Sequence, residues 1–377
     1  MAKLSATELG VLSSKAAMES ANISPDIVDE TFFGNVIQSS TDAAYLSRHI
    51  ALKSGLSTEA PSLTINRLCG SGFEAVCMAA EAIELRRANV ILTGGTENMS
   101  QCPMVIDGLS SRFGTALGKG LKAEDSLWCS LSDSHAGVSM GLTAENLADK
   151  YDISREESDL YALRSQQLYA LARDSGIYEA EISPVTVKTR KGPEVVSADE
   201  HPRETSLEKL QKLNAIFRPD GGRVTAGSAS GICDGSASLV VASEAACKEH
   251  SLQPLARVVS WARTGCDPSI MGVGPVKSIE AALKAANLTL DDMDVVEINE
   301  AFAAQYLACE KALGLDRSKT NIHGGALALG HPLAASGARI LVHLTHELTR
   351  SGKRYAIGAA CIGGGQGIAV LIENAQL

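Results

Sequence analysis

The chain has 377 residues, of which 45% are hydrophobic and 21% are charged, a composition typical of a globular protein with two or three domains. Its formal net charge of −10 argues against broad nucleic-acid binding, and no apolar run approaches the length of a membrane span. Nine cysteines without C-x-x-C pairs or regular spacing argue against a disulfide framework or a structural zinc, and they favour a reducing compartment.

The N-terminal segment reads as the first helix of the fold. It contains Glu8 and Glu19, is short of arginine and lacks the apolar stretch of a secretory signal. It is therefore a poor match to both signal and transit peptides, and we expect a structural helix here.

Cys69 lies between a short apolar strand at 63–65 and an apolar-periodic helix at 73–86, in the run N-R-L-C-G-S-G-F. The N-terminal end of a helix carries a partial positive charge, which favours a thiolate over a thiol. The neighbouring glycines leave the sulfur uncrowded. The pattern favours a nucleophilic cysteine, and the alternative is a buried cysteine that packs as a small hydrophobic residue.

The two ends of the chain resemble each other at a constant offset of 265 residues. Ala21-Asn22 matches Ala286-Asn287, and Ser71-Gly72 matches Ser336-Gly337. Each copy reads as a helix, a strand, a glycine-rich turn, a second helix and a second strand. This alternation predicts an α/β fold of two duplicated halves, with mostly parallel sheets covered by helices.

The repeat also indicates a strand that the first copy lacks. In the second copy an apolar strand at 255–263 precedes the helix at 275–286, and the offset places its counterpart before Met1. If that strand is central, its loss leaves two unpaired strand edges inside a sheet. We therefore expect the first strand of the N-terminal half to be missing, as in a truncated or alternatively started chain.

An inserted region separates the two copies. It contains a helical stretch at 154–175 and a turn-rich section at 188–223, where eight Lys/Arg against six Asp/Glu hint at an anionic ligand, although a solvated surface is the simpler explanation. A small, glycine-rich run at 224–231 suits a close approach of backbone to a ligand. The predicted domains are an N-terminal half at 1–99, an inserted loop domain at 100–230, a return to the N-terminal half at 231–252 and a C-terminal half at 253–377.

Three further segments lie at glycine-rich turns near predicted strand ends, where ligands gather in open α/β sheets. They are N-E-A-F from Asn299, the run G-G-A-L-A-L-G-H-P that contains His331, and C-I-G-G-G from Cys361. A histidine can deprotonate Cys69, a second cysteine can act as acid and base, and glycine N–H groups can stabilise an oxyanion. Each segment also has a plainer explanation, with Asn299 as a helix cap, His331 as a capping or core residue and Cys361 as a core residue. A metal site formed by Cys69, His331 and Cys361 is conceivable, but the spacing of these residues supports it poorly, and no metal is expected.

Together these motifs resemble the thiolase family. The runs N-R-L-C-G-S-G-F, N-E-A-F-A, G-G-A-x-A-L-G-H-P and C-I-G-G-G-Q-G occur in the family's order, and the resemblance covers almost the whole chain. It implies two duplicated halves with mixed five-stranded sheets covered by helices, plus an inserted loop domain that binds coenzyme A. It also implies an acyltransferase that cleaves 3-ketoacyl-CoA in fatty-acid β-oxidation, with coenzyme A as co-substrate and no permanently bound cofactor.

The resemblance implies a role for each catalytic residue. His331 would activate Cys69, whose thiolate would attack the 3-keto carbonyl and become acylated. Cys361 would protonate the departing acetyl-CoA enolate and later deprotonate the incoming CoA thiol. Asn299, through a water, and His331 would form one oxyanion hole, and the N–H groups of Cys69 and Gly363 would form the other.

For the CoA site the resemblance implies positions in and beside the inserted domain. They are Arg203, Thr205, Leu213, Phe217, Ser230, Met140, Met271 and Phe302. The alignment needs a gap at Arg203 and Thr205. The chain departs from the family pattern at Ser228 and His323, where asparagine is usual, and at Ala334-Ala335, which replaces a glycine-containing pair. We therefore expect shifted CoA contacts or altered packing near His331.

Several alternatives stay open. A biosynthetic acetoacetyl-CoA thiolase would use the same residues with a narrower acyl pocket, and a ketoacyl synthase would need a histidine where Cys361 stands. A non-catalytic acyl-CoA-binding relative would fit the missing strand but not the presence of every catalytic residue. The family also implies a homodimer or homotetramer and a mitochondrial location, with a cytoplasmic or peroxisomal location as the alternative.

Overall fold

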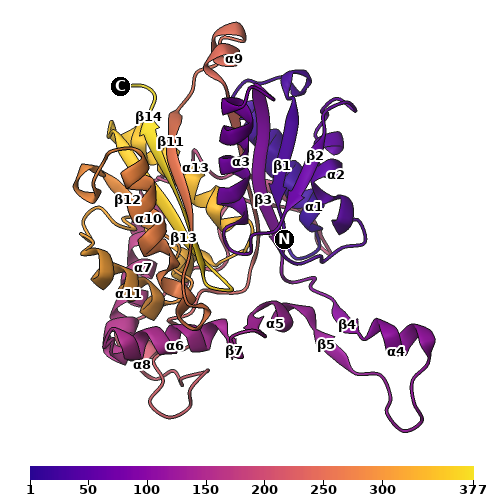
Figure 1. Ribbon diagram of the computed structural model, residues 1–377, viewed down its shortest axis with the longest axis vertical. Coiled ribbons are helices and arrows are strands. Elements are labelled where there is room, and N and C mark those ends of the chain that lie inside the picture. The colour runs from indigo at the N-terminus through magenta and orange to yellow at the C-terminus, as the bar shows by residue number, and fades with distance from the viewer.

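The computed structural model describes all 377 residues and shows two similar halves, each built on a four-stranded sheet (Figure 1). The first sheet runs β10 (Asp234–Ala242), β3 (Val90–Asn98), β1 (Glu30–Gly34) and β2 (Ser62–Ile65), and the second runs β11 (Ala256–Gly265), β14 (Gln366–Asn374), β13 (Tyr355–Ile362) and β12 (Val295–Ile298). In the first sheet β10 is antiparallel to three parallel strands. In the second, β11 and β14 are each antiparallel to the neighbouring strand, and β13 and β12 are parallel. The predicted fold of two duplicated α/β halves with mixed sheets is confirmed.

Each sheet has four strands where the resemblance implied five. In the second half the fifth position is reduced to an isolated bridge between Val296 and Thr320. In the first half no strand of the chain pairs with the outer edge of β10, the position that β11 occupies against β14 in the second half. Because β11 is an edge strand, its counterpart would also lie at an edge, not at the centre. The pairing of β10 with β3 is in unbroken register, so the first sheet is continuous without that strand.

Helices cover the sheets of both halves (Figure 1). The first half contains α1 (Ala6–Ser20), η1 (Pro25–Ile27), η2 (Ala43–Tyr45), α2 (Leu46–Lys53) and α3 (Ser71–Glu84). The second half, with the connection to it, contains α9 (Glu244–Glu249), η3 (Pro268–Val273), α10 (Gly274–Ala285), η4 (Leu290–Asp292), α11 (Ala303–Leu313), α12 (Ala326–Leu329) and α13 (Ser336–Ser351). None of the helices is both long and apolar enough to pass through a membrane.

The inserted region has two parts. An arm, defined as residues 104–139, projects from the body in Figure 1 and contains β4 (Met104–Ile106), α4 (Gly108–Phe113), β5 (Ala123–Asp125), α5 (Ser126–Ser130), β6 (Ser132–Asp133) and β7 (Val138–Ser139). The remainder packs on the second half and contains α6 (Met140–Lys150), α7 (Arg155–Asp174), β8 (Val185–Thr189), β9 (Gly192–Val196) and α8 (Leu207–Gln211). The helix predicted at 154–175 is confirmed as α7, which begins at a capping box formed by Ser154 and Glu157.

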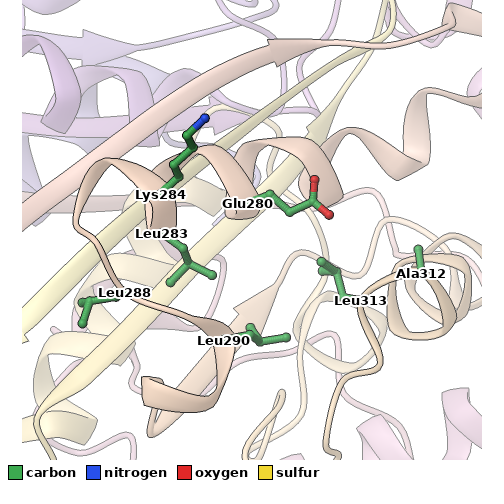
Figure 2. Close-up of a pocket in the computed structure, with 7 residues that line it drawn as sticks. All are labelled: Glu280, Leu283, Lys284, Leu288, Leu290, Ala312 and Leu313. Atoms are coloured by element: carbon green, nitrogen blue, oxygen red, sulfur yellow. The ribbon is translucent and has the colours of Figure 1, made fainter.

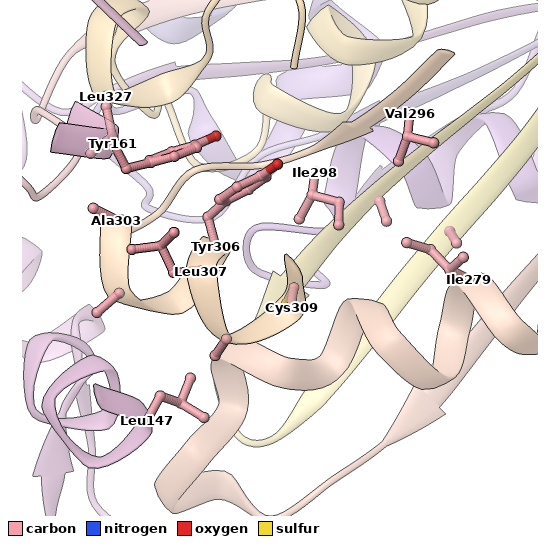
Figure 3. Packing of buried hydrophobic residues seen from close by; sticks show 14 of the residues in the cluster. Leu147, Tyr161, Ile279, Val296, Ile298, Ala303, Tyr306, Leu307, Cys309 and Leu327 are labelled. Atoms are coloured by element: carbon pink, nitrogen blue, oxygen red, sulfur yellow. The ribbon is translucent and has the colours of Figure 1, made fainter. Parts of the chain in front are cut away.

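Helices α6 and α7 complete the core of the second half. Leu147 of α6 and Tyr161 of α7 are buried in one apolar cluster with residues of α11 and β12. Figure 3 shows the rings of Tyr161 and Tyr306 stacked, with centroids 4.1 Å apart and planes 17° from parallel. Aromatic pairs of this kind stabilise a core beyond the area that they bury. This part of the insertion is therefore anchored to the second half.

The first turns of α3 and α13 meet where the two halves contact each other. A methyl group added to Gly72 would lie 2.5 Å from the Ala338 nitrogen, and one added to Gly337 would lie 2.5 Å from the Phe73 nitrogen. The Ser-Gly pairs matched in the repeat are therefore points where two backbones touch, which requires glycine. This contact places the N-terminal ends of the two helices side by side.

Candidate active site

Cys69 lies in a tight turn directly before α3, as predicted. Leu68, the preceding residue, has a φ of 47°, a conformation that residues other than glycine rarely adopt. Two side chains hold this turn: Asn66 Oδ1 accepts a hydrogen bond from the Leu68 N–H at 3.0 Å, and the Ser71 hydroxyl donates to the Leu68 carbonyl at 2.7 Å. Backbone strain that the surroundings maintain in this way is common at functional sites.

The thiol of Cys69 is protonated at rest. Burial is the largest effect on its pKa, and together with the charge of Glu97 it raises the pKa to about 12, although the N–H groups of Cys69 and Gly363 hydrogen-bond the sulfur and lower the pKa. The expectation of a resting thiolate is therefore wrong, because desolvation of the charged form outweighs the donors at the helix end. A base is needed to convert this thiol into a thiolate.

The second cysteine, Cys361, lies near the end of β13 and is completely buried. Burial raises the pKa of its thiol well above the ordinary value, and the nearby Cys69 adds to that increase. Gly363 follows in the turn after β13, and its N–H reaches the Cys69 sulfur. The structure thus brings together three of the predicted catalytic residues, which come from both halves.

His331 is buried, with 5% of its surface exposed. Burial, with a smaller contribution from the positive charge of Arg339, lowers its pKa to about 4, so the imidazole is neutral at physiological pH. Its Nδ1 lies 2.6 Å from the Ser336 hydroxyl, which donates its own hydrogen to the Pro332 carbonyl at 3.2 Å. In the tautomer that suits these two contacts, Nδ1 carries the imidazole hydrogen and Nε2 is the basic nitrogen. The contact between Ser336 and His331 was not predicted, and the match of Ser336 with Ser71 in the repeat is the signal that could have indicated it.

Asn299 follows β12 and faces His331, with 1% of its surface exposed. Its Nδ2 lies 3.4 Å from His331 Nε2, and its Oδ1 has no hydrogen-bond partner in the chain. A buried amide oxygen without a partner is costly, so this atom is suited to a water or a substrate group. His331 and Cys69 are not hydrogen-bonded to each other, and catalytic contacts of this kind often tighten only when substrate binds.

Glu300, next to Asn299, connects this turn to the inserted domain. Its carboxylate accepts hydrogen bonds from the Tyr161 and Ser165 hydroxyls at 2.7 Å each, and from the Leu327 N–H at 3.1 Å. Leu327 belongs to the glycine-rich run that leads to His331. Glu300 therefore fixes the segments of Asn299 and His331 relative to α7. This role of Glu300 was not predicted, because its hydrogen-bond partners lie far away along the chain.

Five of the eight predicted CoA contacts gather beside Cys361. They are Met140, Met271, Phe302, Phe217 and Ser230. The first three pack around Cys361 and Ala301. Phe217 meets Phe302 edge to face, with ring centroids 6.2 Å apart, and the Ser230 N–H donates to the Ala301 carbonyl at 3.0 Å. These residues form a largely apolar wall that leads to the second thiol.

The other three predicted CoA contacts lie farther out on the insertion. Leu213 is 37% exposed and approaches the loop at Gly227, where an added methyl group would meet its side chain at 2.9 Å. Arg203 and Thr205 precede α8, and the backbone N–H of Arg203 donates to Gln166 Oε1 at 3.0 Å. No hydrogen bond joins Arg203 or Thr205 to the wall beside Cys361, so a CoA-binding role for them stays a prediction.

A second apolar cluster surrounds Cys69, and we call it the Cys69 cluster. Its buried members are Ile37, Met99 and Leu333, and the partly buried residues packed against them are Val36, Cys69, Cys102, Leu127 and Leu131. Leu127 lies on α5 and Leu131 follows it, so the base of the arm contributes to the surroundings of Cys69. The two thiols therefore contact different apolar clusters.

A surface hollow on the second half, shown in Figure 2, is separate from this site. It lies between α10 and the end of α11 and is lined by Glu280, Leu283, Lys284, Leu288, Leu290, Ala312 and Leu313. None of these residues belongs to the catalytic group or to the predicted CoA contacts.

Two family models match the chain: Thiolase, N-terminal domain, over residues 1–245 and Thiolase, C-terminal domain, over residues 252–374. The chain therefore belongs to the thiolase family and is an acyltransferase enzyme.

Individual relatives are similar to the chain over almost its whole length. The chain is 55% identical over 370 residues to the mitochondrial 3-ketoacyl-CoA thiolase of Homo sapiens, covering 98% of this chain and 92% of the relative. It is 47% identical over 375 residues to the acetyl-CoA acetyltransferase of Escherichia coli (strain K12), covering 99% and 94%. The crystal structure of human mitochondrial 3-ketoacyl-CoA thiolase matches with a TM-score of 0.97 at 54% identity, covering 99% of this chain and 94% of that one. The structure of the same human enzyme in complex with CoA matches with a TM-score of 0.96 at 53% identity, covering 99% and 93%.

Proposed function

We propose that this chain is a 3-ketoacyl-CoA thiolase, which uses CoA to cleave a 3-ketoacyl-CoA into acetyl-CoA and a shortened acyl-CoA in fatty-acid β-oxidation. The observation that carries the proposal is one buried site, built from both halves, that holds two protonated thiols and a neutral histidine. The identity to the human mitochondrial enzyme supports the substrate class, and the CoA complex of that enzyme supports CoA as co-substrate.

The first half-reaction transfers the acyl group to Cys69. His331 Nε2 takes the thiol proton, and the sulfur attacks the C3 carbonyl of the substrate. The bond between C2 and C3 then breaks, and its electron pair leaves with acetyl-CoA as an enolate. Cys361 gives its proton to that carbon. The N–H groups of Cys69 and Gly363 are placed to stabilise one developing oxyanion, and Asn299 with His331 the other.

The second half-reaction restores both thiols. CoA gives its thiol proton to the Cys361 thiolate, and its sulfur attacks the thioester carbonyl on Cys69. The bond between that carbonyl carbon and the Cys69 sulfur breaks, and the leaving thiolate recovers its proton from His331. Each proton and electron pair is thereby accounted for, and the neutral imidazole is ready for another cycle.

Thiolysis rates measured against acyl-chain length test this function. We expect cleavage of a series of 3-ketoacyl-CoA substrates well beyond acetoacetyl-CoA, with acetyl-CoA detected as the common product. Activity confined to acetoacetyl-CoA would instead support a biosynthetic thiolase, the second candidate, which the identity to the Escherichia coli acetyltransferase favours. A folded protein without any thiolysis would support a non-catalytic acyl-CoA-binding role.

The Cys69 cluster makes a specific prediction about chain length. An acyl group on Cys69 would lie against Leu127, which is partly buried there. We expect Leu127→Ala to raise kcat/KM for longer substrates relative to shorter ones by about 10-fold, because a missing methylene in an apolar pocket is worth roughly 1–3 kcal/mol of discrimination. Kinetics with paired substrates measures the ratio. Leu171→Ala, at a leucine of α7 that is 65% exposed, is the matched control. An unchanged ratio in Leu127→Ala would place the acyl chain elsewhere.

We propose that the chain forms a homodimer or a homotetramer, with the arm as a contact between copies. The arm exposes several large apolar side chains, namely Met104, Leu109, Phe113, Leu117 and Leu121, which are 51–104% exposed. Exposed apolar groups concentrated in one segment of the chain indicate an interaction surface. Phe113→Asp is expected to yield a smaller species in light scattering, and Leu160→Asp on α7 is the control. An unchanged mass would remove the arm from the interface.

We also propose a mitochondrial location. The support is the sequence identity to several enzymes that are named as mitochondrial 3-ketoacyl-CoA thiolases. Imaging of the protein in its own cells tests the proposal, and a cytoplasmic or peroxisomal signal would overturn it.

A further inference from the structure

Glu97, on β3, is a buried carboxylate that the reaction above does not use. It has no exposed surface. Its carboxylate accepts four hydrogen bonds, from Asn35 Nδ2 at 3.2 Å and from the backbone N–H groups of Val36 at 3.1 Å, Ile37 at 3.0 Å and Ala334 at 3.2 Å. The first three donors follow β1 of the first half, while Ala334 belongs to the segment of the second half that begins at His331.

The same segments contact the nucleophile. Ile37 and Leu333, which precedes the bonded Ala334, are buried members of the Cys69 cluster, as is Met99, two residues beyond Glu97. Cys69 packs directly against this cluster. The carboxylate of Glu97 therefore binds the backbone that supports the Cys69 side chain from both halves.

We propose that Glu97 is a positioning residue that joins the turn after β1 (residues 35–37) to the segment that begins at His331, and whose negative charge adds to the burial that keeps Cys69 in its thiol form until His331 takes the proton. A charge buried in a low-dielectric interior acts strongly on a neighbouring charge of the same sign. A retained proton protects the cysteine, because the thiolate is the form that oxidants and electrophiles attack.

The effect of Glu97 on Cys69 depends on pH, because it requires the charged form of the carboxyl group. Burial raises the pKa of this carboxyl to about 7, against the opposing effect of the N–H groups of Ile37, Ala334 and Val36. The titratable groups that face it are the thiols of Cys69 and Cys102, whose pKa its charge raises, and His331 lies three residues before the bonded Ala334. Above about pH 7 the charged Glu97 opposes the Cys69 thiolate, and below that pH the neutral carboxyl does not.

Alkylation of Cys69 by iodoacetamide, quantified on the Cys69 peptide by mass spectrometry from about pH 6 to about pH 9, tests the charge. Glu97→Gln is expected to react several-fold faster than the parent above about pH 8, and the two rates should converge near pH 6, where the parent carboxyl is protonated. Coinciding profiles from folded proteins would overturn the charge effect.

Glu145→Gln is the matched control for the loss of a buried carboxylate. Glu145 has no exposed surface and accepts hydrogen bonds from the backbone N–H groups of Arg223 and Val224 at 2.9 Å, but it is not a neighbour whose charge affects Cys69. We expect this variant to keep the parental alkylation profile. A shift as large as that of Glu97→Gln would overturn the assignment to Glu97.

The positioning role has a kinetic test, which rests on the proposed thiolase function. Glutamine turns an N–H group toward backbone donors, so Glu97→Gln must break at least one of the bonds that the carboxylate makes with the N–H groups of Val36, Ile37 and Ala334. We expect kcat to fall about 10- to 100-fold with little change in KM, because a small misplacement of reacting groups is costly. Glu97→Asp keeps the charge on a shorter side chain, so it should lose kcat but retain the parental alkylation profile. A variant that loses only thermal stability would reduce Glu97 to a structural residue and overturn the proposal.

The parent protein alone also tests the charge effect, even if the glutamine variant fails to fold. The logarithm of the Cys69 alkylation rate should rise with pH at a slope below one around pH 7, because ionisation of Glu97 opposes thiolate formation there. A slope of one throughout would overturn the proposal. Alkylation uses no CoA substrate, so this result stands apart from the success or failure of the thiolase function.

Discussion

Replacing Cys69 by serine is expected to abolish thiolysis, with kcat reduced by about 10⁴-fold or more. The hydroxyl that replaces the thiol is a much weaker acid, while burial holds the pKa of His331 at about 4 and makes this imidazole a modest base. The base can therefore not generate an alkoxide at a useful rate. The loss should appear in kcat, because the substitution changes only the reacting atom in the turn before α3 and leaves the apolar wall beside Cys361 unchanged.

Incubation with acetyl-CoA followed by peptide mass spectrometry measures the covalent step directly. We expect one acetyl group on the Cys69 peptide of the parent and none on that of Cys69→Ser. Cys247→Ser changes a partly buried cysteine on α9, outside the site, and should leave both the adduct and kcat unchanged. An adduct on another cysteine, or thiolysis that survives in Cys69→Ser, would refute the assignment of the nucleophile.

Removing the imidazole with His331→Ala is expected to lower kcat by about 10²- to 10⁴-fold, the range that general acid–base catalysis contributes. The protonated thiol of Cys69, whose pKa burial raises to about 12, then has no base within the site. Cys361 is also a protonated thiol and cannot replace the imidazole. Steady-state kinetics measures the effect, and His250→Ala, at an exposed histidine, is the control. A variant with parental kcat would exclude His331 as the base.

The pH dependence of the His331 contribution follows from the same burial. In the parent, the acid limb of kcat/KM that belongs to His331 should fall near pH 4, not near the ordinary histidine value of about 6.5. Between these values the unfolded chain binds the proton and the folded one does not, so the contribution of His331 to stability falls as pH falls from about 6.5 to about 4. Urea denaturation at about pH 6.5 and about pH 4 should show a smaller loss of unfolding free energy in His331→Ala than in the parent. An equal loss in both proteins would contradict this sign.

Much of the fold and the location of the site are local properties of this sequence. Apolar strands, glycine-rich turns and the Ser-Gly repeat predicted the duplicated α/β architecture and the helix that follows Cys69, because these signals depend on residues close together in the chain. They also located the segments of Asn299, His331 and Cys361. Their chemical roles stay predictions that the experiments above test.

Other properties were decided only by the tertiary structure. The protonation of Cys69 was mispredicted from the helix end, since desolvation by Ile37, Met99 and Leu333 outweighs local donors, and those residues come from three separate segments. A missing central strand would have left two unpaired edges. The sheet order instead places β11, the counterpart of the missing strand, at an edge of its sheet. Glu300 and Glu97 could not be assigned from sequence, because a buried carboxylate is defined by the donors around it, and these donors come from distant parts of the chain.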